Sequence, residues 1–258
     1  MDTDAVLTLL QDVAAEVINP RFRDLASEEI VEKNPGDLVT VADREAEALI
    51  TKALSAAYPD ALVLGEEAEA SDPTLEERFR AADHAFTVDP VDGTKNFVKG
   101  SPDHAVMVAE IRGGETVRSW IWQPQHRLAY VAEQGAGAWR DGHRLNRPPV
   151  GDRMRGVTSR RSWIGRALGT LSALELTWVC CGVDYPKLVE GEADYAVYRK
   201  GKPWDHAPGS LLLSEAGGRL GTFDGVPYAP QAGEPTGLVA AADQATYDLV
   251  HGLLPDLG

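Results

Sequence analysis

The chain has 258 residues, 43% of them hydrophobic, and its 25 Lys and Arg residues against 40 Asp and Glu residues give a formal charge of −15. This length allows one large domain or two closely packed halves. The negative charge favours solubility and argues against nucleic acid or an anionic membrane as a partner.

Three features indicate a protein of the reduced cytoplasm. The two cysteines, Cys180 and Cys181, are adjacent in sequence, and adjacent cysteines rarely form a structural disulfide. The first four residues include two acids and lack the basic-then-apolar pattern of a signal peptide. Apolar runs stay well short of the ~20 residues that a membrane-spanning helix needs.

Helices are predicted at the start of the chain. Apolar residues at helical spacing predict a helix over 6–17 that Pro20 ends, and a second helical piece over 22–31. A polar turn around Pro35-Gly36 separates these two pieces from the next helix.

The next segment begins with a helix start signal. Thr40 and Asp43 form a capping-box pattern before a long amphipathic helix. A short buried strand then leads to Glu66 and Glu67. Residues 68–82 are acidic and are expected to be irregular, with at most a surface helix.

A run of strands is predicted next, beginning with a buried strand that stops at Asp89. Further strands are expected at 105–111, 117–122 and 128–132, followed by a hairpin at Asp141-Gly142. Pro148-Pro149 is the predicted seam. It divides the chain into an α+β half, residues 1–148, and an α/β half, residues 149–258.

Strand and helix patterns alternate after this seam. Strands are expected at 157–158, 176–179, 195–198, 220–223 and 238–241. Helices are expected at 163–171, 185–189, 205–215 and 247–254. This alternation predicts an α/β arrangement with helices packed on a sheet.

The stretch from Ala85 to Phe97 carries the strongest chemical signal. Its apolar strand ends in Asp89 and Asp92, and Gly93 opens a short helix. Two carboxylates this close repel each other unless a cation lies between them. Amides at a helix start can hold a phosphate. The combination indicates metal-assisted phosphate chemistry.

Asp89-Pro90-Val91-Asp92-Gly93-Thr94 also resembles the signature of the inositol monophosphatase family, the magnesium-dependent, lithium-sensitive phosphomonoesterases. Leu64-Gly65-Glu66-Glu67 and Pro203-Trp204-Asp205-His206-Ala207 resemble two further family motifs, in the family's order. The resemblance covers most of the chain. It implies a layered α-β-α-β-α sandwich of the inositol monophosphatase and fructose-1,6-bisphosphatase type, and a homodimer.

The same resemblance implies which residues bind metal. Glu66, Asp89 and the Val91 carbonyl would hold one Mg²⁺, and Asp89, Asp92 and Asp205 would hold a second. Two or three Mg²⁺ ions are expected per active site, since this hard cation prefers oxygen ligands. Glu66 is also a catalytic candidate, because the metals activate a water for direct attack on phosphorus.

Further roles are implied for neighbouring residues. Thr94, paired with Asp43, would orient the attacking water. The amides of Gly93 and Thr94 would bind the phosphate. Lys33 and Glu67 match positions near the family's more weakly held third metal.

Each of these residues also has a simpler interpretation. Asp92, Thr94 and Asp205 fit helix capping, Asp43 completes the capping box, and the Glu pair fits solvated loop charges. Asp89 is harder to explain without a ligand, because an acid that closes an apolar strand needs a partner.

Substrate recognition is expected from the second half. Animal inositol monophosphatases carry a Glu seven residues before the position of Asp205, where this chain has Tyr198 followed by the basic residues Arg199, Lys200 and Lys202. An aromatic face suits an imidazole or adenine, and basic side chains suit a second phosphate.

The predicted function is therefore hydrolysis of a small phosphorylated metabolite, with inositol 1-phosphate as the leading substrate. Histidinol phosphate, 3′-phosphoadenosine 5′-phosphate and a sugar bisphosphate are the alternatives. Tyr198, Arg199 and Asp184 are the candidates for substrate specificity. A non-catalytic metal-binding regulator is the rival from another class, and a pure binder need not keep the whole ligand set. Ser210 and Ser214 lack the context of a nucleophile.

Overall fold

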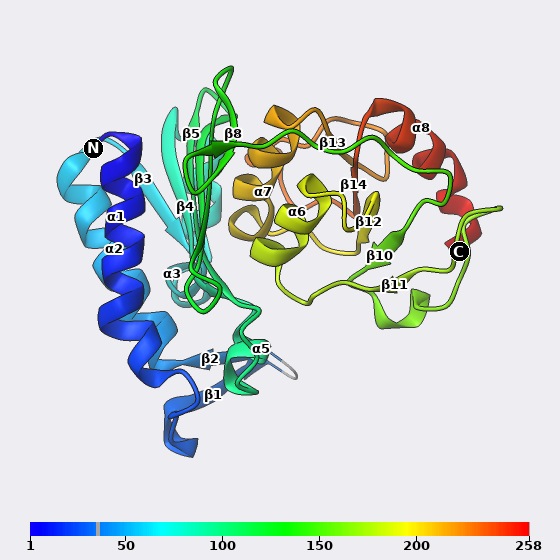
Figure 1. The fold of residues 1–258 in the computed structure, drawn as a ribbon. Coiled ribbons are helices and arrows are strands. Elements are labelled where there is room, and N and C mark those ends of the chain that lie inside the picture. The colour runs from blue at the N-terminus through cyan, green and yellow to red at the C-terminus, as the bar shows by residue number, and fades with distance from the viewer. Residues whose placement is uncertain (35–36, 258) are drawn as a thin grey trace.

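The computed structural model describes residues 1–34 and 37–257 and stacks helices and sheets in five layers (Figure 1). α1 (Thr3–Val13) and α2 (Val41–Ala57) cover the outer face of a seven-stranded sheet. α6 (Cys181–Val189) and α7 (Pro203–Glu215) lie between this sheet and a five-stranded sheet, and α8 (Gln244–Leu253) covers the far face. The predicted layered sandwich is confirmed.

Apolar faces hold the layers together. Leu10 of α1 and Ile50 of α2 pack against Phe86 and Trp120 of the first sheet, and all four side chains are fully buried. Burying a side chain of this kind contributes roughly 1.5–3 kcal/mol. Within the described residues, no helix is both long and apolar enough to cross a membrane.

The N-terminal segment stays helical to Arg21, one residue beyond Pro20. Asp2 caps α1 by accepting a hydrogen bond from the Ala5 amide at 2.8 Å. The chain continues through a π-helical turn (Ala14–Ile18) and a 3₁₀ turn (Asn19–Arg21).

The predicted helical piece over 22–31 is wrong. Apart from a 3₁₀ turn (Ser27–Glu29), this segment leads into β1 (Ile30–Asn34), which pairs antiparallel with β2 (Asp37–Thr40). The pairing of β1 with β2 decides the structure of this segment and leaves Val31 44% exposed. The predicted turn at Pro35-Gly36 lies outside the described residues.

The seven strands of the first sheet follow one another in chain order. They are β3 (Leu62–Gly65), β4 (His84–Asp92), β5 (Ala105–Arg112), β6 (Glu115–Gln123), β7 (Leu128–Glu133), β8 (Gly137–Arg140) and β9 (His143–Arg144). β3 and β4 are parallel and the other pairs are antiparallel. Asp141 and Gly142 both have positive φ, at 49° and 76°, as a two-residue hairpin turn of this kind requires.

Residues 68–82 are more regular than the sequence predicted. Two short helices, α3 (Glu66–Ser71) and α4 (Thr74–Ala81), connect β3 to β4. Leu75 and Phe79 of α4 are buried against the first sheet, which explains why this acidic segment folds.

The five-stranded sheet has the order β11-β10-β12-β14-β13. Its strands are β10 (Gly156–Thr158), β11 (Glu175–Leu176), β12 (Tyr195–Tyr198), β13 (Arg219–Thr222) and β14 (Leu238–Ala241). The helix predicted over 163–171 is wrong, because only a 3₁₀ turn (Arg161–Trp163) forms there. Gly165 and Gly169 adopt left-handed φ values of 82° and 53°, which a helix does not allow.

The two other predicted elements near this sheet change length. The strand predicted over 176–179 is reduced to β11, and α6 begins at Cys181 rather than at residue 185. Pro148-Pro149 lies in the link between β9 and β10. The division into halves at that point stays a prediction.

Candidate metal centre and active site

A cavity of about 250 Å³ collects the residues that the sequence predicted as metal ligands. It lies where the end of β4, the start of α3, the start of α5 (Thr94–Val98) and the start of α7 meet. Its lining includes Glu66, Asp89, Val91, Asp92, Gly93, Thr94 and Asp205. Segments as far apart as 139 positions, from Glu66 to Asp205, thus meet at one point.

Three carboxylates form the centre of this cavity. One oxygen from each of Asp89, Asp92 and Asp205 lies within 4.8 Å of the others, and this is the one such group within residues 1–34 and 37–257. Asp89 is 1% exposed, and its Oδ1 atom has no hydrogen-bond partner among the described residues. An orphaned buried carboxylate oxygen beside two more carboxylates fits a hard divalent cation.

Burial sets the protonation of this cluster. It raises the pKa of Asp89 and of Asp205 well above the usual range, and the neighbouring carboxylates add to the effect. Burial also raises the pKa of Asp92 to about 6, although hydrogen bonds from the Cys180 thiol and the Gly182 amide favour its charged form. Without a cation, therefore, the cluster retains protons.

A bulge at the end of β4 places Asp89 and Asp92. Asp89 pairs with Met107 and Asp92 with Ala105, so three steps along β4 match two along β5. Pro90 has no amide to donate to the sheet, which is compatible with such an irregularity. The strand was predicted to stop at Asp89, whereas it continues to Asp92 through this bulge.

Gly93 turns the chain from β4 into α5. Its φ is 81°, and a Cβ at this position would lie 3.0 Å from the Asp103 carbonyl oxygen and from Cys180 Cβ. Only glycine fits this turn without strain. The Gly93 amide also favours the charged form of Asp92. The proposed contact of the Gly93 and Thr94 amides with phosphate stays a prediction.

Thr94 and Asp43 meet across 51 positions of sequence. The Thr94 hydroxyl lies 3.1 Å from Asp43 Oδ1 and 3.1 Å from the Val91 carbonyl oxygen. Asp43 Oδ2 accepts hydrogen bonds from the Thr40 amide at 2.9 Å and from the Thr40 hydroxyl at 2.5 Å. One oxygen of Asp43 therefore serves the capping box while the other faces Thr94, so the two interpretations of Asp43 are compatible.

Lys33 lies between the two glutamates that open α3. Its Nζ atom is 2.9 Å from Glu66 Oε1 and 2.8 Å from Glu67 Oε1. Burial lowers the pKa of Lys33, but the two glutamates have the larger combined effect and raise this pKa overall. Burial raises the pKa of Glu66 to about 7. A protonated ammonium has no lone pair for a metal, so in this state Lys33 is no ligand. The third-metal role of Glu67 stays a prediction.

Asp205 is the third residue of α7, after Pro203 at the first position. The residue that precedes the helix is Lys202, and the helix has no side-chain cap. The capping alternative for Asp205 is therefore wrong. His206, the next residue, is buried and uses both ring nitrogens, on the Tyr185 hydroxyl at 2.8 Å and on the Lys200 carbonyl at 3.0 Å.

A second cavity, of about 470 Å³, adjoins the first and shares Asp92 and Asp205 with it. Tyr198 and Asp184 are both part of its lining and are almost fully buried. The Tyr198 hydroxyl donates to Asp184 Oδ2 at 3.4 Å, and Asp184 Oδ1 accepts from the Trp178 amide at 2.8 Å. Burial raises the pKa of Asp184 well above the usual range.

The basic residues that follow Tyr198 diverge. Arg199 and Lys200 line the 470 Å³ cavity. Lys202 lines a different cavity and lies 3.4 Å from Glu69 Oε1. Lys200 lines that other cavity too, so the three basic residues do not all line one cavity, and Lys202 lies outside the 470 Å³ one.

Several residues at this site were missed in the sequence. Glu47 of α2 is 6% exposed and accepts hydrogen bonds from the amides of Glu67 at 2.7 Å and Ala68 at 2.8 Å, so it anchors the start of α3. Gly65 allows this approach, since a Cβ there would lie 2.3 Å from Glu47 Cδ. The available signal was the position of Glu47, four residues after Asp43 and three before Ile50, on the buried face of the helix.

Cys180 and Asn96 make contacts between the segment that joins β4 to α5 and the second half of the chain. The buried Cys180 thiol donates to Asp92 Oδ2 at 2.9 Å. The Asn96 amide donates to the Trp178 carbonyl at 2.9 Å. Val179, between Trp178 and Cys180 in the chain, has a φ of 61°, which is a strained conformation for a β-branched residue. Its side chain lines both cavities. No sequence pattern pointed to these contacts.

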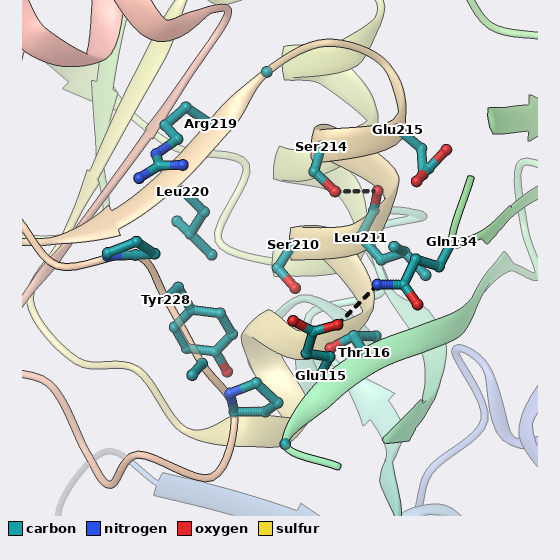
Figure 2. A pocket seen from close by; sticks show the side chains of 15 residues that line it. Glu115, Thr116, Gln134, Ser210, Leu211, Ser214, Glu215, Arg219, Leu220 and Tyr228 are labelled. Atoms are coloured by element: carbon teal, nitrogen blue, oxygen red, sulfur yellow. Dashed lines mark hydrogen bonds between the residues drawn. The ribbon is translucent and has the colours of Figure 1, made fainter. Parts of the chain in front are cut away.

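A further cavity, of about 430 Å³, lies at the other end of α7 (Figure 2). Ser210 and Ser214 face it, but their hydroxyls donate to the carbonyls of Ala207 at 2.8 Å and Leu211 at 3.1 Å. Glu215 accepts from two backbone amides. These groups make hydrogen bonds within the fold. That neither serine is a nucleophile stays a prediction.

We expect the metal-free protein to lose stability as the pH rises from about 4 to about 7. The pKa of Asp92 in the folded chain, about 6, and that of Glu66, about 7, exceed their ordinary values. The folded state therefore binds more protons than the unfolded state in this window, and the free energy of unfolding falls with pH. A divalent cation favours the charged forms, so Mg²⁺ should raise the unfolding temperature more at about pH 7.5 than at about pH 5. A thermal shift from Mg²⁺ that is equal at both pH values would contradict this prediction.

Comparisons with known proteins agree with this geometry. The sequence profile of the inositol monophosphatase family matches residues 2–257. An inositol-1-monophosphatase of Rhizobium meliloti is 33% identical over 211 residues, which are 76% of this chain and 76% of the relative. The Nus factor SuhB of Pseudomonas aeruginosa is 31% identical, with 82% of each chain covered.

Solved structures show the same fold. A staphylococcal inositol monophosphatase-1, in a lithium chloride inhibitory complex, superposes with a TM-score of 0.83 at 21% identity. The superposition covers 97% of this chain and 93% of that chain. Together with the match of the family profile over nearly the whole sequence, this leads to one conclusion: the chain belongs to the inositol monophosphatase family of phosphoric monoester hydrolases.

Proposed function

We propose that this protein is a Mg²⁺-dependent phosphatase that hydrolyses a small phosphorylated metabolite by direct attack of water. The observation that carries the proposal is the convergence of Asp89, Asp92 and Asp205, with one buried oxygen of Asp89 left unpaired among the described residues. Buried carboxylates that repel one another need a cation to become charged, and Mg²⁺ prefers oxygen ligands.

The ligand assignment follows the arrangement in the cavity. Glu66, Asp89 and the Val91 carbonyl would hold one Mg²⁺, and Asp92 and Asp205 would join Asp89 around a second. When bound, these ions would lower the pKa of water and stabilise the charge on the leaving oxygen. The cations that these acidic residues would hold would also give a strongly negative protein a site that tolerates a phosphate.

Thr94 and Asp43 would orient the attacking water. The Thr94 hydroxyl has two acceptors within 3.1 Å, Asp43 Oδ1 and the Val91 carbonyl, and can donate its one proton to only one of them. With that proton held by Asp43, the lone pairs of Thr94 would accept a hydrogen bond from water and direct its oxygen toward phosphorus. Orientation of this kind lowers the barrier by fixing the attack geometry in advance.

Inositol 1-phosphate is the reference substrate, supported by the name of the Rhizobium meliloti relative. A cytoplasmic location and a homodimer belong to the same proposal and rest on the family resemblance. Lithium inhibition is expected at millimolar concentration or below, and a staphylococcal structure described as an inhibitory complex soaked in 100 mM lithium chloride supports inhibition by lithium.

The test is a panel of phosphomonoesters incubated with the purified protein, read as released phosphate. We expect turnover with Mg²⁺ that stops when a chelator is added. The alternative is a non-catalytic metal-binding protein, which a relative named Nus factor SuhB supports. Such a protein would bind Mg²⁺ and release no phosphate from any ester. Histidinol phosphate, 3′-phosphoadenosine 5′-phosphate and a sugar bisphosphate belong in the panel beside inositol 1-phosphate.

A further inference from the structure

The 470 Å³ cavity beside the metal centre has a concentration of positive charge that the chain as a whole does not. Its lining contains five cationic side chains, those of Lys95, Arg160, Arg161, Arg199 and Lys200. They gather in a protein with a formal charge of −15. A volume of this size suits a small metabolite.

These five cations form no ion pair with a carboxylate among the side chains that the structure describes. Some cations elsewhere on the chain do, for example Lys33, Arg147 and Lys202, and others do not. The Arg160 guanidinium carbon lies 4.6 Å from the centre of the Trp163 ring, in a cation–π contact. Three carboxylates, those of Asp92, Asp184 and Asp205, line the same cavity, so cations outnumber acids by five to three. In the proposed function Asp92 and Asp205 would hold Mg²⁺, which leaves Asp184 as the acid of this lining that is not assigned to a metal.

Two pairs of basic residues, Arg160-Arg161 and Arg199-Lys200, follow neighbouring strands of the second sheet at the same distance along the chain. β10 and β12 are adjacent parallel strands, and Thr158 pairs with Val197. Arg160-Arg161 and Arg199-Lys200 each begin two residues after these partners, so both pairs leave the same carboxyl edge of the sheet. That edge is where α/β sheets commonly bind ligands.

Hydrogen bonds fix this edge. The Thr158 hydroxyl donates to the Val197 carbonyl at 2.9 Å and accepts from the Arg160 amide at 3.1 Å. The Ser159 amide donates to the same Val197 carbonyl at 3.3 Å. The backbone that carries both basic pairs is thus braced before any ligand arrives, as a preorganised site requires.

We propose that these residues form a subsite for a second phosphate of the substrate, so that the preferred substrate is a small bisphosphorylated metabolite. The inference rests on the proposed phosphatase function, since the metal centre would hold the phosphate that is cleaved. Guanidinium groups pair with phosphate oxygens through two parallel hydrogen bonds, which suits Arg161 and Arg199 to this role. A substrate with an amino group, such as histidinol phosphate, would meet five like charges and one acid that is not assigned to a metal, Asp184.

The experiment compares myo-inositol 1-phosphate with myo-inositol 1,4-bisphosphate, which differ only by a phosphate across the ring. We expect wild-type kcat/KM to be at least tenfold higher for the bisphosphate. Arg161→Gln combined with Arg199→Gln should remove this advantage, so that the kcat/KM values for the two substrates come within about twofold of each other. Lys99→Gln is the matched control, because it removes one exposed positive charge at the end of α5, outside both cavities.

A binding measurement separates this inference from the proposed function. Calorimetry on Thr94→Ala in Mg²⁺ should show the bisphosphate binding at least tenfold more tightly than the monophosphate, with the difference lost when Arg161 and Arg199 are also replaced. Equal affinities, or a difference that survives those replacements, would overturn the subsite even if the monophosphate is hydrolysed. A binding preference without hydrolysis of either ester by wild type would support the subsite and overturn the phosphatase.

Discussion

Asp89→Asn is expected to abolish hydrolysis while the protein stays folded. Asp89 lies at the centre of the carboxylate cluster and would contact both metal ions, so loss of its charge weakens the whole centre. We expect kcat/KM to fall by at least ~10³-fold for any phosphomonoester, equivalent to about 4 kcal/mol of transition-state stabilisation. The measurement is phosphate release at saturating Mg²⁺.

The same substitution should raise the unfolding temperature of the metal-free protein. Burial and neighbouring carboxylates penalise the charged form of Asp89, and asparagine removes that charge with little change in volume. Asp83→Asn, at the exposed start of the same β-strand region, is the matched control and should change neither quantity. Near-normal activity of Asp89→Asn in saturating Mg²⁺ would refute the bridging role.

Thr94→Ala and Asp43→Asn are expected to lower kcat by roughly 10²-fold or more each, with a smaller effect on the Mg²⁺ dependence. The two side chains contact each other at 3.1 Å and would orient one water, so they act as a unit. The double variant should therefore be little worse than either single variant. Steady-state kinetics at several Mg²⁺ concentrations measure both effects.

Thr40→Ala separates the two roles of Asp43. It removes the side-chain cap of α2 and should cost about 0.5–2 kcal/mol of stability while leaving the contact from Asp43 to Thr94 in place. If Asp43 serves only as a helix cap, Asp43→Asn will resemble Thr40→Ala, with a lower unfolding temperature and an intact kcat. Losses in kcat that multiply in the double variant would also contradict the shared role of Thr94 and Asp43.

The errors in the predicted elements have a common physical cause. The segment over 22–31 and the segment over 163–171 both contain apolar residues at spacings that a helix allows. In the first, pairing of β1 with β2 leaves Val31 at the surface. In the second, Gly165 and Gly169 take left-handed conformations that interrupt a helix. Short periodic patterns do not reveal which neighbour a segment will pack against.

The sequence by itself determined most of the helices and strands and the pair of acids Asp89 and Asp92, and its resemblance to a known family implied the layered fold. Long apolar patterns define the helices and strands that build the layers, and Asp89 and Asp92 are brought together by a few residues of local chain. Asp205 could be added because its motif resembles that of a family whose members share this fold. These features depend on local spacing or on a whole motif, which a single sequence displays directly.

Only the tertiary structure decided the contacts between distant segments. Lys33 between Glu66 and Glu67, Glu47 under α3, and the Cys180 thiol on Asp92 join residues 20 to 88 positions apart. The two basic pairs of the substrate cavity meet because β10 and β12 are neighbours in parallel register, although 39 positions separate them. Such contacts depend on how sheets and helices pack, and no local pattern of residues specifies them.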